Sequence, residues 1–233
     1  LPLRAAAGGV HVRLGFAEAA ADLARAAGAG VAAAGAVLLG PSGELAGRIE
    51  AEEFARRHGL VRVSARAVRD YRRRTEPQVE RAAVADLPTA AGRFRALGYR
   101  GTSGSATPGA EHVVLVAGAL GEPEPVPLHV HAECLTGDVL GSTACGCRRT
   151  WADALARIGG TGRGVLVYHR SPHAQACGLR PDPGTNDAAW TAAAVLADLG
   201  VDAVLPVGLD PAAAEVLSAF GVGVSSEFCA AVG

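Results

Sequence analysis

The chain has 233 residues, of which 49% are hydrophobic and 19% are charged, so it can build one large domain or two small ones. A formal net charge of −1 gives no electrostatic reason to expect nucleic acid or an anionic membrane as a partner. No apolar run reaches the ~20 residues of a membrane-spanning helix, and no signal peptide is recognisable, so a cytoplasmic protein is expected.

The first part of the chain alternates helical and strand-like composition. Apolar residues at helical spacing indicate the helices, and short apolar runs rich in valine indicate the strands. This alternation predicts α/β topology. The basic run Arg72 to Arg74 at the end of the third helix is expected to be solvated. The predicted helices cover 17–27, 49–59 and 64–74, and the predicted strands cover 31–39 and 61–63.

The composition changes near residue 76, and a boundary there divides the chain into domains 1–75 and 76–233. Longer strand-like runs and a Pro/Gly-rich loop at 171–187 mark the second domain. We expect an α/β (α+β) fold. Its predicted strands are 93–99, 112–118, 126–133, 164–170 and 203–207, and its predicted helices are 150–158, 188–199 and 211–219.

Cys134, Cys145 and Cys147 follow the third of these strands in a C-x10-C-x-C spacing. The glycines Gly137 and Gly141 let the intervening loop curl back, so the three sulfur atoms can meet one ion. Three thiolates suit a soft tetrahedral cation, and Zn²⁺ fits best. The alternative is that the cysteines are buried as small apolar residues.

The sequence leaves three candidates for the fourth ligand of such an ion. Water is one candidate, since catalytic zinc sites keep one position for it. His173 and Cys177, on the later Pro/Gly-rich loop, are the other two.

Two segments resemble known enzyme families. The run HVHAECLTGDVLGSTACGC closely resembles the zinc motif of GTP cyclohydrolase II, and the similarity extends over about residues 78–225. Residues 1–74 resemble the C-terminal half of 3,4-dihydroxy-2-butanone 4-phosphate synthase. These families are fused in that order in many bacterial proteins of riboflavin biosynthesis. We therefore expect a partial synthase-like α/β segment, without the first half of that domain, followed by a cyclohydrolase-like zinc domain.

The resemblance to GTP cyclohydrolase II implies a hydrolase that opens the imidazole ring of GTP and releases formate and pyrophosphate. It implies Zn²⁺ held by Cys134, Cys145 and Cys147, with Mg²⁺ assisting if the protein is active. The matching substrate-binding positions are Val130, His131 and Glu133, which makes GTP or another purine nucleotide the expected ligand. A homodimer is also expected.

Several positions depart from the cyclohydrolase pattern. The Arg that opens the zinc motif is His129 here, and the Ser is Ala132. Three further motifs have lost their Arg, Lys or Glu residues, at 171–179, 184–194 and 208–214. Each lost charge-assisted bond to a triphosphate costs about 1.5–3 kcal/mol. Reduced or lost activity is therefore expected. The alternative is a degenerate paralogue that keeps a structural zinc and acts by binding a nucleotide or a partner.

The synthase-like segment departs from its family as well. The family sequence Gly-His-Thr-Glu is Gly15-Phe16-Ala17-Glu18 in this chain. Glu18 matches a catalytic Glu, but Phe16 stands in place of a metal-binding His, and a phenyl ring cannot ligate magnesium. The resemblance therefore implies that synthase activity is absent.

Overall fold

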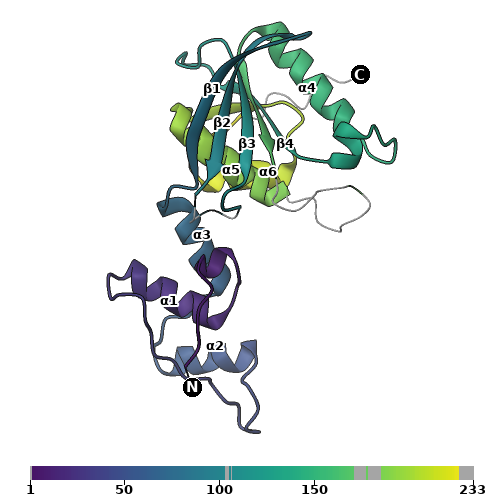
Figure 1. Ribbon diagram of the computed structural model, residues 1–233. Helices are drawn as coiled ribbons and strands as arrows, with labels where there is room; N and C mark the ends of the chain where they lie inside the picture. The colour runs from purple at the N-terminus through teal and green to yellow at the C-terminus, as the bar shows by residue number, and fades with distance from the viewer. Residues whose placement is uncertain (1, 103–104, 106, 171–176, 178–184, 226–233) are drawn as a thin grey trace. The chain divides into compact units, whose positions relative to one another are not determined.

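The computed structural model describes residues 2–102, 105, 107–170, 177 and 185–225 (Figure 1). The chain divides into two compact units, Leu1–Glu76 and Pro77–Gly233. None of the helices in these described ranges is long and apolar enough to cross a membrane.

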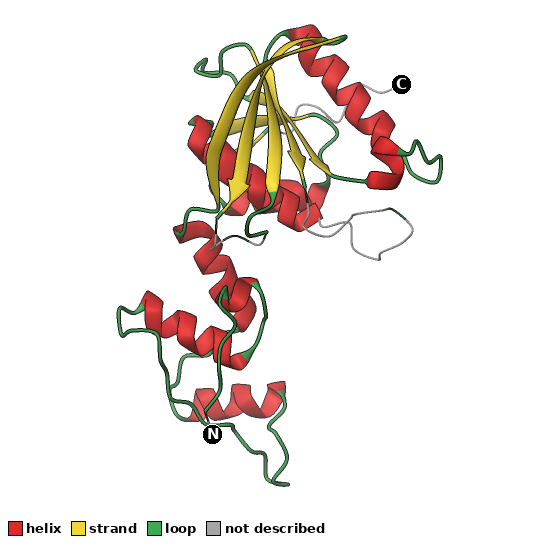
Figure 2. Cartoon of the chain, in the orientation of Figure 1, coloured by secondary structure: helices red, strands yellow, loops and turns green. Residues whose placement is uncertain are grey.

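The first unit is built from helices and irregular segments. Its helices are α1 (Phe16–Ala26), α2 (Arg48–Arg57) and α3 (Ala65–Thr75), with a 3-10 turn at Gly9–His11. The predicted strands 31–39 and 61–63 are wrong, because neither run joins a sheet (Figure 2). Apolar composition alone does not make a strand, which needs a second strand to pair with its N–H and C=O groups.

A buried ionic cluster holds this unit together. The Arg72 guanidinium donates to Asp22 at 2.8 Å and to both oxygens of Glu76, and the Val10 N–H donates to Asp22 at 2.8 Å. Arg72 and Arg73 are only 7% and 3% exposed, so the prediction of a solvated helix end is wrong at both residues. Val10 and Val68 are the buried large apolar residues among the described residues of the unit, and most of its other large apolar side chains are exposed.

The second unit contains one seven-stranded mixed sheet in the order β1-β2-β3-β5-β4-β6-β7. The pairs β1–β2, β2–β3 and β3–β5 are antiparallel, whereas β5–β4, β4–β6 and β6–β7 are parallel. The strands are β1 (Val79–Thr89), β2 (Gly92–Gly101), β3 (Glu111–Ala117), β4 (Val126–Ala132), β5 (Gly164–His169), β6 (Ala203–Pro206) and β7 (Gly223–Val224).

Helices cover both faces of this sheet (Figure 1). Alternate residues of β3 and β5 face opposite sides, so Leu115 and Leu166 pack on α4 (Cys147–Thr161). Val114 and Val167 pack on the other side, against α5 (Thr185–Leu199) and α6 (Pro211–Ala219). Strands that are buried on both faces have continuous apolar sequences, and for this reason the apolar runs predicted β3 and β5.

Two buried histidines stack between adjacent strands of the sheet. The rings of His112 on β3 and His169 on β5 lie 4.7 Å apart. The Arg170 N–H donates to His112 Nδ1 at 3.2 Å, and His169 Nδ1 lies 3.1 Å from the Thr191 hydroxyl. Burial lowers the pKa of His112 to about 3 and that of His169 to about 4. Both rings are therefore neutral at neutral pH.

This burial predicts acid sensitivity of the second unit. Unfolded, the His169 imidazole takes up a proton below pH ~6.5, whereas folded it does so only near pH 4. The stability it contributes is complete above pH ~6.5 and is lost as the pH falls towards 4. Between pH 7.5 and 5 the loss is about 2 kcal/mol. His169→Gln should reduce the pH dependence of the unfolding free energy by that amount.

Urea unfolding followed by tryptophan fluorescence measures this effect, because both tryptophans, Trp151 and Trp190, belong to the second unit. The exposed His58→Gln is the control for the substitution itself. An unchanged pH dependence in His169→Gln would contradict the prediction.

Candidate metal centre

Four cysteines, not three, meet at one point of the second unit. The sulfur atoms of Cys134, Cys145, Cys147 and Cys177 all lie within 4.8 Å of one another. Cys134 Sγ is 3.9 Å from Cys145 Sγ, and Cys147 Sγ is 3.5 Å from Cys177 Sγ. Four sulfurs bound at ~2.3 Å to a tetrahedral zinc would lie about 3.8 Å apart. The four side chains are therefore spaced to enclose one such ion.

Parallel strand pairing brings these cysteines together. Strands β4 and β5 are parallel neighbours, so their carboxyl ends emerge at the same edge of the sheet. Cys134 follows the end of β4, and Cys177 lies on the segment that follows β5. The Glu133 N–H donates to the His169 carbonyl at 2.8 Å, which continues the strand contact up to the first cysteine.

Gly137 leaves the space in which the sulfur atoms gather. It lies in the π-helical turn Leu135–Val139 directly after Cys134. A Cβ atom at this position would lie 2.8 Å from Cys145 Sγ and 3.3 Å from Cys134 Sγ. The first contact is shorter than Cβ atoms make and the second is tight, so a side chain here would displace the sulfur atoms. Gly141, at φ +70°, makes the second bend of the loop, as the sequence predicted.

The protonation of the thiols also fits a bound cation. Burial opposes ionisation of Cys134, but the Thr136 hydroxyl and the N–H groups of Cys177 and Gly137 outweigh it and lower its pKa to about 6. Burial and the neighbouring thiols raise the pKa of Cys147. Ionisation of one thiol thus disfavours ionisation of the next. Metal ligation requires deprotonated sulfur, and a divalent cation would relieve the repulsion between the thiolates.

A polar cluster lies directly behind the cysteines. His131 is 6% exposed, and its Nε2 lies 3.0 Å from Asp138 Oδ2. The Tyr168 hydroxyl donates to the same oxygen at 2.7 Å. Burial and then Asp138 raise the pKa of Tyr168, so the phenol keeps its proton and remains a donor.

Of the other predicted substrate-binding residues, Val130 lies on the opposite side of the sheet from His131, whereas Glu133 acts on Tyr168, whose ring stacks on His131. Val130 packs against the core on the α5 and α6 side of the sheet. Glu133 pairs with Arg170, at 3.4 Å between Oε1 and Nε. His129 is 1% exposed, and its Nδ1 lies 2.7 Å from the Val207 carbonyl. Burial lowers the pKa of His129, so this ring carries no charge at neutral pH.

Two arginines near the cysteines were not predicted from the sequence. Arg148 and Arg149 line a hollow of about 680 Å³ beside Cys145. Their position directly after the zinc motif is the sequence feature that could have indicated them. The Arg163 guanidinium donates to the Glu124 and Pro125 carbonyls, before the start of β4. His173 lies outside the described residues.

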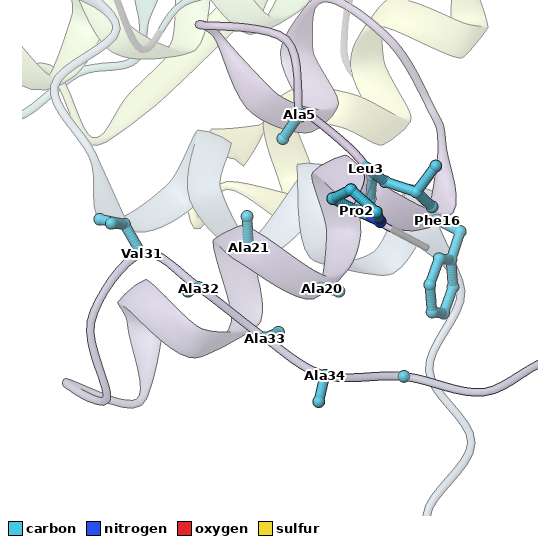
Figure 3. Close-up of a pocket in the computed structure, with 12 residues that line it drawn as sticks. Pro2, Leu3, Ala5, Phe16, Ala20, Ala21, Val31, Ala32, Ala33 and Ala34 are labelled. Atoms are coloured by element: carbon cyan, nitrogen blue, oxygen red, sulfur yellow. The ribbon is translucent and has the colours of Figure 1, made fainter.

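The first unit shows no comparable cluster within its described residues. Glu18 is buried and accepts hydrogen bonds from Arg13 Nε at 2.8 Å and from the Ala6 N–H at 2.9 Å. Arg13 is the main cause that lowers the pKa of Glu18 to about 2. Phe16 borders a hollow of about 460 Å³ whose other lining residues are mostly small and apolar (Figure 3). Phe16 therefore adds an apolar ring to this hollow and offers no metal ligand.

Comparison with known proteins confirms both resemblances. Residues 80–182 match the family model of GTP cyclohydrolase II, and residues 1–71 match that of 3,4-dihydroxy-2-butanone 4-phosphate synthase. The riboflavin biosynthesis protein RibBA of Salinispora arenicola is 45% identical over 179 residues, which are 77% of this chain and 42% of that protein. RibBA of Mycobacterium tuberculosis (strain CDC 1551 / Oshkosh) is 41% identical over 185 residues, 77% of this chain and 43% of that protein.

A solved structure is similar over nearly the whole chain. It is RibBX, described as a two domain 3,4-dihydroxy-2-butanone 4-phosphate synthase from A. baumannii. The TM-score is 0.68 at 28% sequence identity, and the match covers 97% of this chain and 63% of that one. This chain spans less than half the length of the curated relatives named above.

The four-sulfur arrangement predicts that Cys177 is a zinc ligand. The purified protein should bind one zinc per chain, and Cys177→Ser should weaken binding roughly 100-fold, since one of four bonds is lost from a site worth ~10–16 kcal/mol. Chelator competition measures the affinity. Cys229→Ser, outside the described residues, is the matched control and should bind like the unaltered protein. Equal affinity in Cys177→Ser would show that Cys177 is not a ligand.

Proposed function

We propose that this chain is a GTP cyclohydrolase II-like protein of riboflavin biosynthesis that has lost the ring-opening reaction and keeps its zinc for structure. One observation carries the proposal: Cys177 brings a fourth sulfur within 4.8 Å of the other three. The family matches and the RibBA relatives support the assignment to this pathway.

A fourth thiolate changes what zinc can do. Catalytic zinc sites have three protein ligands and a water molecule, whereas sites with four cysteines are closed and structural. The resemblance implies that ring opening needs a zinc-activated water as the nucleophile. A zinc surrounded by four sulfurs has no position for that water. The expected ligands Cys134, Cys145 and Cys147 would thus hold an ion that stabilises the fold.

The strand residues beside the centre also provide little positive charge for a triphosphate. His129, which replaces the Arg of the family motif, is buried and neutral. Arg170 pairs with Glu133, the residue before Cys134, so its positive charge is offset by that carboxylate. Charge-assisted hydrogen bonds to phosphate are stronger than neutral ones, and neither His129 nor the paired Arg170 is well suited to make them.

Binding without turnover is the second candidate function. Arg148 and Arg149 favour it, because they face the hollow beside Cys145 and could attract an anionic ligand. Such a ligand would bind outside the metal centre. The proposed structural role of zinc therefore does not depend on it.

GTP ring opening should be at least ~10³-fold slower than in an active relative, because general acid–base help alone is typically worth 10²–10⁴-fold. Formate release from GTP with zinc and magnesium measures the rate. RibBA of Salinispora arenicola, assayed in parallel, is the reference protein. Formate release at a comparable rate, lost in Cys145→Ser, would refute the proposal.

The chain should also form no 3,4-dihydroxy-2-butanone 4-phosphate from ribulose 5-phosphate. Phe16 provides no metal ligand, and Arg13 engages the carboxylate of Glu18. Product detection by mass spectrometry tests this expectation, with Glu18→Gln as the matched variant. Product from the unaltered chain that disappears in Glu18→Gln would contradict it.

A further inference from the structure

Asp138 joins the cysteine turn to two strands of the sheet. It lies within the turn Leu135–Val139, and its side chain is 9% exposed. The Cys134 N–H donates to its Oδ2 at 2.9 Å, and the Tyr168 hydroxyl donates to the same oxygen at 2.7 Å. His131 Nε2 lies 3.1 Å from Oδ1 and 3.0 Å from Oδ2. One carboxylate thus contacts groups from β4, β5 and the first cysteine.

Aromatic rings enclose this carboxylate cluster and extend it to α4. The rings of His131 and Tyr168 stack at 5.3 Å. Trp151 lies 5.4 Å from the His131 ring and 5.2 Å from the Tyr168 ring. Trp151 is on α4, whose first residue is Cys147. The cluster therefore contacts the elements that carry both Cys134 and Cys147.

The donors around Asp138 occupy both of its oxygens, so the side chain acts through the cysteines and not on the ion itself. The sulfur of Cys134 can reach the other three only if its backbone stays at the end of β4. The hydrogen bond from the Cys134 N–H to Asp138 fixes that backbone. The bonds from His131 and Tyr168 fix Asp138 in turn.

We propose that Asp138 is the positioning residue of the metal centre: it holds Cys134 in ligating geometry and thereby sets the affinity for zinc. This inference rests on the proposed four-cysteine zinc site. Groups that orient metal ligands typically change affinity 10–100-fold when they are removed. A carboxylate suits the role, because it accepts from several donors at once, whereas an amide has one accepting oxygen.

The test compares zinc affinities of the full chain by chelator competition. Asp138→Asn should bind zinc 10–100-fold more weakly but still reach one zinc per chain at saturation. Tyr168→Phe removes one donor and keeps the carboxylate, so a smaller loss is expected. Asp153→Asn, an exposed acid on the same helix as Trp151, is the matched control and should bind like the unaltered protein.

A cobalt(II) spectrum of each variant separates positioning from general stability. Asp138→Asn should shift the sulfur-to-cobalt and ligand-field bands, because the geometry at Cys134 changes, while Asp153→Asn should leave them in place. If Asp138→Asn does not fold, the affinity and spectrum of Tyr168→Phe decide the question.

Two results would overturn the inference: equal affinity and spectra in all variants, or equal weakening in Asp138→Asn and Asp153→Asn. Absence of zinc from the unaltered protein would instead overturn the proposed function. Formate release would also count against that function, but it would leave the affinity ratio between variants measurable.

Discussion

The parallel pairing of β4 with β5 is the constraint on which the cysteine centre depends. It places two chain segments, separated by a whole helix and strand, at the same edge of the sheet. The turn after β4 then needs only a glycine and a hydrogen-bonded aspartate to present its sulfur atoms to Cys177. Burial of both sheet faces keeps these strand ends fixed, so the centre depends on the core beneath it.

The sequence predicted contacts within one loop better than contacts between segments that are far apart in the chain. The spacing of Cys134, Cys145 and Cys147 was sufficient to place three sulfurs together, because their approach is made within one loop. Cys177 stayed one of three alternatives, since its position depends on the register of β5. Arg72 shows the same limit: its partner Asp22 lies 50 residues away, and the composition of α3 alone indicated a solvated end.

The two units differ in how far apolar patterning predicts structure. In the second unit, apolar runs find neighbouring strands and become a sheet. In the first, the run at 31–39 has similar composition, but its residues such as Val31 and Val37 are about 70% exposed and join no sheet.

Two substitutions relative to the family motifs differ in how far the sequence alone explains their effect. The change to Phe16 is readable from sequence as the loss of a ligand, whereas neutrality of His129 follows only from its burial.

A zinc bound as proposed would link Cys134 to Cys177, and this link would have a topological consequence. Joining residues 43 positions apart closes a ring of chain that contains all of α4 and β5. Unlike a disulfide, this link exists only while the folded chain presents its thiolates, so it would stabilise the fold through the free energy of metal binding. A protease that cuts between α4 and β5 would leave Cys134, Cys145 and Cys147 on one fragment and Cys177 on the other, joined through the ion. Chelation would remove this link, and the fragments would then be held by the pairing of β5 with β3 and β4 and by the shared core.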